Sequence, residues 1–321
     1  MAGDNTIPGF VDLQVNGYAG VDFNQDRLSA ERLRCACQLL REDGVAGVLA
    51  TIVTAGLPQM LTRLERIADA RRRDALVRDV IWGIHIEGPF LNESPGYAGA
   101  HPPQAMRPAD LDVMQRLLDA ADGLARLVTL APERDAGCRV TRWLAGQRIM
   151  VSAGHCDPTL DELRAAADAG LSMFTHLGNG CPMMLHRHDN IVQRALSLRD
   201  RLTLCFIADG PHVPPVALAN YLSLAGTDRT VLVTDAISAA RLGPGTYTLG
   251  GQSITVGDDL VAWAADHSHF AGSTATMPRM VALLRDQLHL PDDEIEKLVS
   301  RNPRKALGQQ PYVPSPSVSA G

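Results

Sequence analysis

Aromatic residues and excess positive charge are both scarce in this sequence. Phe, Tyr and Trp make up 4% of its 321 residues, and the formal net charge is −6 at pH 7. A nucleic-acid-binding surface needs clustered Lys and Arg, commonly with aromatic side chains for stacking, and neither pattern is found. We therefore expect no nucleic-acid partner.

Long apolar runs and targeting segments are also lacking. No run approaches the roughly 20 apolar residues that a membrane-spanning helix requires. The first ten residues, MAGDNTIPGF, contain neither the basic segment nor the apolar core of a secretory signal. The six cysteines do not have zinc-finger spacing, so reduced thiols are expected. Together these features predict a cytoplasmic protein without membrane association.

Strand-like and helix-like segments alternate along most of the chain, and 45% of residues are hydrophobic, which allows a large core. Short, nearly continuous apolar runs, typical of strands buried on both faces, are found at 8–17, 47–54, 79–88, 125–133, 148–155, 171–178, 202–210 and 230–237. Amphipathic helical patterns lie between them. Eight such repeats predict a (β/α)8 barrel. A doubly wound open sheet is the alternative, although no glycine-rich phosphate loop follows the first run.

Two segments depart from this alternation. Residues 241–263 are rich in glycine and contain alternating polar and apolar residues, which predicts a small β-hairpin excursion from the barrel. Residues 309–321 are rich in Pro and Ser, which is typical of a flexible tail. We therefore expect one barrel domain over residues 1–308.

A β-α-β unit is predicted between Ser152 and Pro182. Two apolar runs in this segment lead to His155 and His176, and the stretch between them has helix start and stop signals, with Thr159 or Asp157 as the cap. Strands joined by one helix run parallel, so both histidines are expected at one edge of one sheet.

Polar residues close most of the predicted strands, and they would meet at the same barrel rim. They are Gln14, Asn16, His85, Glu87, His155, His176, Asp209, His212 and Asp235. Each has an ordinary structural explanation: a strand-end histidine is commonly a hydrogen-bonded residue, Asp235 could cap a turn, and Glu87 could pair with an arginine. Their coincidence on one rim favours a site, because buried polar groups are costly unless paired or metal-bound.

One carboxylate and two imidazoles would leave an open coordination position for water, as in hydrolytic zinc sites. Asp235 could then accept a proton from that water and pass it to a leaving amine.

An ordered set of motifs carries a family resemblance. The motifs are PGFVDLQVNG, GIHIEGPFLNESPGYAGAH, VSAGHCDPTLDELRAAADAG, FTHLGNGCP, IADGPHV and LVTDAIS. Over residues 7–308 the chain resembles the N-acetylglucosamine-6-phosphate deacetylases of the amidohydrolase superfamily. The resemblance implies a small-molecule substrate, N-acetylglucosamine 6-phosphate, that is hydrolysed at its N-acetyl amide.

The resemblance also implies roles for particular residues. Glu87, His155 and His176 match the metal ligands of that family. Asp235 matches its catalytic aspartate, and His101 matches a histidine that contacts and polarises the substrate carbonyl.

Four further residues match substrate contacts of the family. Asn179 and Gly180 match a pair whose backbone approaches the sugar phosphate, and His212 matches a phosphate contact. Arg187 falls where the family has an arginine that reaches the substrate of a neighbouring subunit, which implies a homodimer. The sequence around Arg187 differs from the family pattern, and local pairing of Arg187 with an aspartate in a solvated loop is the alternative.

The superfamily commonly has His-x-His on its first strand, whereas this chain has Gln14 and Asn16. Amides are weaker ligands of transition metals than imidazoles, so this vestigial second position is expected to be empty and one divalent metal is expected. Zinc suits the ligand set best, and Fe2+, Mn2+ and Co2+ also fit it.

Family members usually carry an accessory β-sandwich, and this chain is expected to lack it. Two other functions stay open. The first is a related amidohydrolase that acts on a different N-acyl sugar or on an N-acyl or cyclic amide. The second is a non-catalytic binding barrel, although the presence of both candidate ligands and a candidate acid-base group disfavours it.

Overall fold

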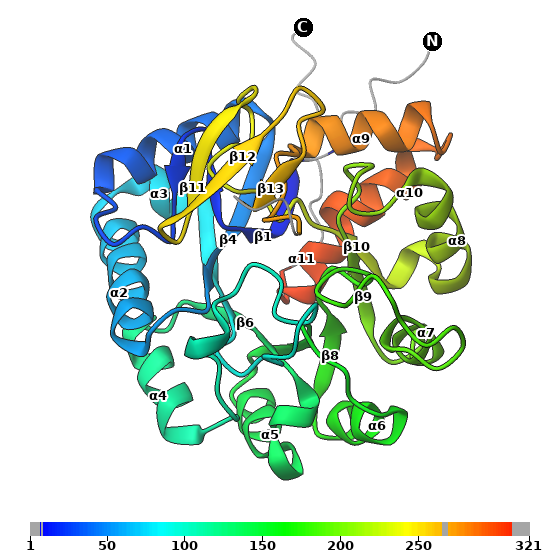
Figure 1. Cartoon of the computed structure of the whole chain (residues 1–321). Helices are drawn as coiled ribbons and strands as arrows, with labels where there is room; N and C mark the ends of the chain where they lie inside the picture. Colours follow the sequence, from blue (N-terminus) through cyan, green and yellow to red (C-terminus); the bar gives the residue numbers. More distant parts are fainter. Residues whose placement is uncertain (1–6, 8, 265–268, 310–321) are drawn as a thin grey trace, which may run out of the picture.

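The protein, described here by a computed structural model of residues 7, 9–264 and 269–309, is built around one eight-stranded parallel sheet (Figure 1). Its strands follow one another in the order of the sequence. They are β1 (Phe10–Val15), β4 (Val45–Val53), β5 (Ile81–Glu87), β6 (Ala125–Leu130), β7 (Met150–Ala153), β8 (Leu171–Phe174), β9 (Thr203–Phe206) and β10 (Thr230–Leu232).

Helices surround the strands (Figure 1). They are α1 (Ala30–Glu42), α2 (Leu57–Arg73), α3 (Ala75–Val80), α4 (Leu111–Ala120), α5 (Arg139–Gly146), α6 (Leu160–Asp168), α7 (Ile191–Ser197), α8 (Pro215–Ala225), α9 (Met277–Asp286), α10 (Asp292–Glu296) and α11 (Asn302–Ala306). The predicted (β/α)8 barrel is therefore confirmed. None of the helices in the described part of the chain combines the length and apolar composition needed to cross a lipid bilayer.

Alternation along each strand separates two apolar clusters. On β4, for example, Leu49 belongs to a cluster inside the barrel, whereas Val48 and Ala50 belong to the larger cluster that packs against the helices. The inner cluster consists of Val11, Leu13, Leu49, Leu127, Met173, Cys205, Ile207, Val231 and Val233. Because both faces of the strands are buried, the strand sequences are apolar almost throughout.

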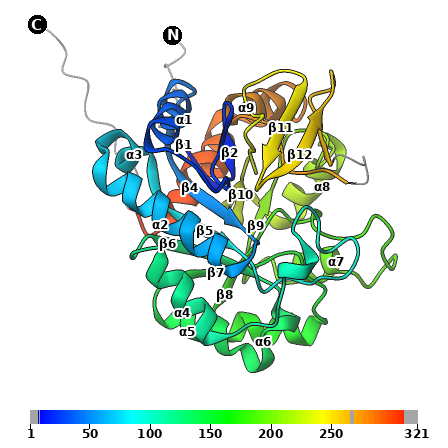
Figure 2. The same ribbon diagram turned by 60° about the vertical axis from the view of Figure 1, so that its left-hand side comes forward.

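Two small antiparallel sheets flank the barrel. One pairs β2 (Gly17–Tyr18) with β3 (Val21–Asp22). The other contains β11 (Gly245–Leu249), β12 (Gln252–Val256) and β13 (Ala262–Ala264), so the region predicted as a hairpin contains a third strand. Both views place this sheet on the opposite side of the molecule from α4, α5 and α6 (Figure 2). Apart from residue 309, the predicted tail lies outside the described residues.

The barrel closes where β1 meets β10. The two strands share no regular ladder, and a bridge between Val15 and Ala236 joins them beyond the end of β10. Below it, the buried Asp12 carboxylate accepts hydrogen bonds from the Thr234 hydroxyl at 2.5 Å and from the Thr234 amide at 3.2 Å. Burial raises the pKa of Asp12 from 3.8 to about 7, against the opposing effect of the Thr234 hydrogen bonds.

The raised pKa makes the seam sensitive to pH. The stabilising contribution of Asp12 is fully present below pH 4, where the carboxyl is protonated in the folded and unfolded chains, and it is lost as pH rises through about 7. Asn at this position does not ionise. We therefore expect the unfolding free energy of Asp12→Asn, compared with that of wild type, to be more favourable to folding at pH 7.5 than at pH 4.5 by about 2–4 kcal/mol. Urea unfolding at both pH values measures this difference. Asp258→Asn, at an exposed position, is the control. The prediction would be contradicted if the unfolding free energies of Asp12→Asn and wild type differed by the same amount at both pH values.

Candidate active site

A cavity of about 760 Å³ lies at the carboxyl ends of the barrel strands. Of the site residues proposed from the sequence, all except Gln14, His85, Arg187 and Asp209 line it: Asn16, Glu87, His101, His155, His176, Asn179, Gly180, His212 and Asp235. Residues spread over more than 200 positions of sequence thus meet in one cavity, as the shared rim of parallel strands allows.

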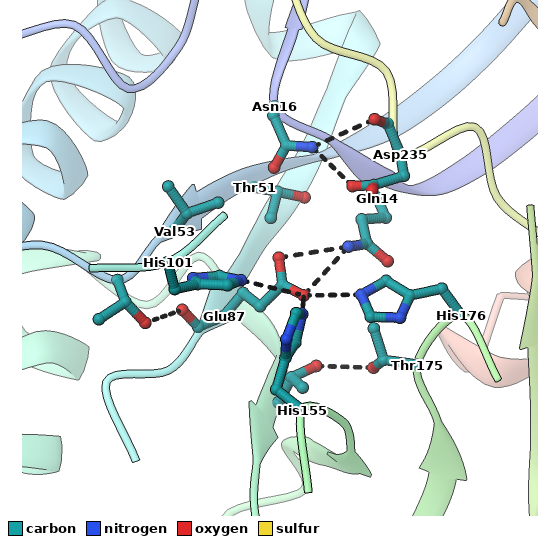
Figure 3. Close-up of polar contacts among 12 residues, drawn as sticks. Gln14, Asn16, Thr51, Val53, Glu87, His101, His155, Thr175, His176 and Asp235 are labelled. Carbon is teal, nitrogen blue, oxygen red and sulfur yellow. Dashed lines mark hydrogen bonds and ion pairs between the residues drawn. The ribbon is translucent and has the colours of Figure 1, made fainter. Parts of the chain in front are cut away.

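Glu87, His155 and His176 form a tight buried group in this cavity (Figure 3). The Oε1 atom of Glu87 lies 3.1 Å from Nε2 of His176 and 3.4 Å from Nε2 of His155. One potential ligand atom from each residue lies within 4.8 Å of the other two. The described residues therefore place one carboxylate oxygen and two imidazole nitrogens where a single divalent metal could contact all three.

The two histidines do not belong to the strands that precede them. β7 ends at Ala153 and β8 at Phe174, so the predicted strands 148–155 and 171–178 are too long. His155 and His176 have φ values of 50° and 31°, in the left-handed region that non-glycine residues seldom occupy. This conformation ends the strand ladder, and the side chains of both residues point toward Glu87 (Figure 3). Strain at such positions is typical of functional sites.

Hydrogen bonds orient the candidate ligands. The Nδ1 atom of His155 lies 2.8 Å from the carbonyl oxygen of Tyr97, and donation there leaves the Nε2 lone pair free for a metal. Gly180 packs against the same ring, because a Cβ at this position would lie 2.8 Å from Nδ1 of His155. The Gln14 amide donates to both carboxylate oxygens of Glu87 at 3.2 Å. The donor set and its supporting contacts fit a divalent metal.

Charge and burial shift the acidity of these groups. Burial raises the pKa of Glu87, but its contacts with His155 and His176 outweigh this effect and hold the pKa well below its usual value. Burial lowers the pKa of His101 to about 3, so its imidazole is neutral at physiological pH. The result is an anionic ligand beside a neutral imidazole.

Asp235 lies at the edge of the same group and also has a left-handed backbone, with a φ of 50°. Its Oδ1 accepts a hydrogen bond of 2.7 Å from the Asn16 amide (Figure 3). Desolvation raises the pKa of Asp235 to about 6, although the nearby His176 opposes the shift. A carboxylate with a pKa close to neutrality can both accept and return a proton. Asn16 and Gln14 thus act as donors to the two carboxylates that line the cavity, Asp235 and Glu87.

A layer of hydroxyl groups below the metal-ligand group was not identified from the sequence. His85 contacts Thr129 at 2.7 Å and Thr51 at 3.3 Å through its two ring nitrogens. Thr175 continues the network, with contacts of 2.8 Å to Thr129 and 2.6 Å to Ser152. The available signal was a single hydroxyl residue within each of several apolar strand runs. The layer supports the strand ends that hold Glu87 and His176.

A second polar group positions His212. Its Nδ1 lies 2.6 Å from Oδ2 of Asp209, and the Ser273 hydroxyl donates to the same oxygen at 3.0 Å. Burial raises the pKa of Asp209, but the His212 contact outweighs it and leaves that pKa below its usual value. His212 lines the cavity. Its second ring nitrogen, Nε2, has no hydrogen-bond partner among the described residues and is available to a ligand in the cavity.

Arg187 lies outside this cavity on an exposed loop. The loop is solvated, as the alternative expected, and its local Arg–Asp pair is formed by Arg194 and Asp189 at 2.6 Å. Arg194 also contacts Asp157 at 2.9 Å and so ties the loop to the start of α6. Arg187 makes no contact with the cavity of its own chain in the described structure.

The contact from Gln14 to Glu87 can be tested through metal affinity. Gln14→Leu keeps the approximate size of the side chain but removes the only amide donor to Glu87 among the described residues. We expect about 10–100-fold weaker metal binding, because outer contacts orient a metal ligand. Competition with a chelator measures it. Gln38→Leu, on the exposed side of α1, is the matched control; equal affinities of the two variants would refute this role.

Comparison with known proteins agrees with this geometry. No protein-family model matches the chain. It is 33% identical over 305 residues to N-acetylglucosamine-6-phosphate deacetylase of Bacillus subtilis, covering 94% of this chain and 75% of the relative.

A second relative, N-acetylgalactosamine-6-phosphate deacetylase of Escherichia coli O157:H7, is 33% identical over 94% of the chain and 78% of the relative. The structure of a Mycobacterium smegmatis N-acetylglucosamine-6-phosphate deacetylase mutant in complex with N-acetylglucosamine 6-phosphate superposes with a TM-score of 0.85 at 35% identity, covering 94% of this chain and 78% of that one. The chain therefore belongs to the N-acetylglucosamine-6-phosphate deacetylase family.

Proposed function

We propose that the protein hydrolyses the N-acetyl amide of N-acetylglucosamine 6-phosphate to glucosamine 6-phosphate and acetate. The observation that carries this proposal is the convergence of His155 and His176 on Glu87 beside Asp235, in a cavity at the barrel rim. Relatives and solved structures that match nearly the whole chain carry the name of this activity.

Glu87, His155 and His176 would hold one divalent metal, with zinc as the best match and Fe2+, Mn2+ or Co2+ as other candidates. When bound, the metal supplies Lewis-acid polarisation of the amide carbonyl and lowers the pKa of water. Gln14 and Asn16 are engaged as donors to Glu87 and Asp235, which supports one metal per chain.

Asp235 would move the proton that the reaction requires. Its carboxylate takes a proton from the attacking water as the C–O bond forms, and it returns that proton to the amine nitrogen as the C–N bond breaks. The Asn16 amide holds the carboxylate in one orientation.

His101 would contact the substrate carbonyl. Its imidazole is 6% exposed and its Nε2 lies 3.9 Å from Oε1 of Glu87, so it faces the centre of the ligand group. A neutral imidazole donates one N–H, and such a donor stabilises the negative charge that develops on the carbonyl oxygen.

The phosphate would bind at the other end of the cavity. His212, held by Asp209, the backbone amide of Gly180 and the unpaired side-chain amide of Asn179 lie there as donors, whereas the Asn179 backbone amide donates to the His176 carbonyl at 2.9 Å. Arg187 would reach the cavity of a second subunit, because it is exposed and lies away from its own cavity. We accordingly propose a homodimer. We also propose a cytoplasmic location, in keeping with six free cysteines.

Asp235→Asn tests the proton-transfer role. Asn keeps the shape of the side chain but cannot accept and return the proton, so we expect turnover to fall at least about 10²–10⁴-fold. Metal content should be unchanged, because Asp235 is not among the three ligands. Steady-state kinetics with metal analysis of the same sample measures both. A variant with full metal and ordinary turnover would exclude Asp235 as the acid-base group.

The substrate is tested with a panel of N-acetylated sugars. We expect kcat/KM to be much higher for N-acetylglucosamine 6-phosphate than for N-acetylglucosamine, because only the phosphate contacts His212. N-acetylgalactosamine 6-phosphate belongs in the panel, because a galactosamine-named relative is as similar as the glucosamine-named one. Faster hydrolysis of the galactosamine substrate, or of an N-acyl amide without phosphate, would replace the proposed substrate.

A further inference from the structure

A second cavity of about 430 Å³ adjoins the active site. It lies between the end of β4, the loop that carries His101 and the turn from β11 to β12. Val53, Ala100, His101 and Leu249 line both cavities, so the partition between them is one layer of residues thick. We call this space the side cavity. Its only described neighbour among the proposed catalytic residues is His101.

Helix α2 begins at the wall of the side cavity. Its N-cap, Gly56, provides no side-chain cap, and its first turn contains no acidic residue. Gly56 and Gln59 both line the cavity. The start of a helix carries partial positive charge, which favours an anion near it. In α2 this attraction comes from the helix dipole and not from free amides, because Pro58 has no N–H and the Gln59 and Met60 amides donate to the Gly56 carbonyl at 2.9 and 3.1 Å. No acidic residue in the first turn of α2 therefore compensates the positive end of its dipole.

The buried cation Arg63 lies two turns further along the same helix and also lines the side cavity. Its side chain is 4% exposed. Nε and Nη2 donate to Oδ1 of Asp26 at 3.1 and 2.9 Å, whereas Nη1 has no hydrogen-bond partner among the described residues. Asp26 is 62% exposed, so water screens its charge more than that of the buried guanidinium.

His101 supplies a third polar group. Its Nδ1 is buried and makes no hydrogen bond within the described structure, although the side chain is 6% exposed. Buried polar atoms nearly always have partners. With the His101 N–H at Nε2, Nδ1 is an acceptor, so its missing partner is a donor such as a water molecule, and the same water can donate to a bound carboxylate. Asp22, the other nearby carboxylate, does not line the cavity, and its oxygens accept the amides of Asn24 and Gly250 at 2.8 Å.

We propose that the side cavity binds a small carboxylate through Arg63 Nη1, near the positive end of the α2 dipole. The identity of that carboxylate rests on the proposed function: it is acetate, which amide hydrolysis releases beside His101. An Arg guanidinium can offer two N–H groups to one carboxylate, and the positive end of the α2 dipole adds electrostatic attraction. The side cavity thus provides a place for the acid product that is separate from the place of the sugar phosphate.

The test uses a charge placed at the wall of the cavity. Gln59 is exposed and occupies the third position of α2, where glutamate favours a helix, so Gln59→Glu should fold normally. Gln193→Glu is the matched control, because Gln193 is exposed and occupies the third position of α7. ¹³C-labelled acetate is titrated into the metal-loaded enzyme and followed by NMR. We expect about 10-fold weaker acetate binding for Gln59→Glu from like-charge repulsion, and wild-type binding for Gln193→Glu.

Arg63→Gln provides an independent arm. Because Asp26 is exposed, water solvates its carboxylate when Arg63 is replaced. We expect acetate binding to be weakened at least as much as in Gln59→Glu. Thermal melting checks that the variant is folded. Unchanged acetate affinity in Gln59→Glu, or an equal loss in Gln193→Glu, would overturn the side-cavity site. The titration requires no turnover. Acetate binding that depends on Gln59 and Arg63 in an enzyme that hydrolyses no N-acetyl sugar would therefore retain this site and reject the proposed function instead.

Discussion

A carboxylate buried at the mouth of a barrel is the constraint on which the site depends. Glu87 is 2% exposed, and an isolated ion at such a position would cost several kcal/mol. The surrounding contacts compensate this charge: two imidazole nitrogens lie close to one carboxylate oxygen, and the Gln14 amide donates to both carboxylate oxygens. These three groups come from β1 and from the segments after β7 and β8, so only a closed barrel brings them together. In the proposed enzyme, a divalent metal completes the compensation.

The barrel interior changes in character along its axis. Aliphatic side chains fill one part, as in the inner cluster around Leu13 and Leu49. Hydroxyl groups and the neutral His85 follow, paired with one another between strands of the barrel. The charged ligand group comes last, at the open end. Each polar atom in the middle layer therefore bonds within the protein and leaves Glu87 free to face the cavity. This order reconciles a dry, well-packed core with a polar site only a few residues away.

Much of this was predictable because it depends on local patterns. Apolar runs between amphipathic segments predicted all eight strands in order, and Thr159 with Glu162 forms the capping box that begins α6. Strand ends were less accurate, because the left-handed backbones of His155 and His176 depend on packing around the cavity. The third strand, β13, pairs with β12 across an intervening loop, and alternation within one segment does not reveal such a pairing. Asp12 was missed because a lone acidic residue in an apolar strand carries no signal of its partner.

By itself, the sequence determined the repeating strand–helix order and the polar residues that close the strands, because both follow from burial and from the period of each element. It also carried the amides at Gln14 and Asn16. Only the tertiary structure decided which carboxylate each amide serves, that Asp189 binds Arg194, and that Arg63 faces a cavity beside His101. These outcomes depend on distances between residues that are remote in the chain. Such distances are determined by barrel closure and side-chain packing, for which no local sequence pattern exists.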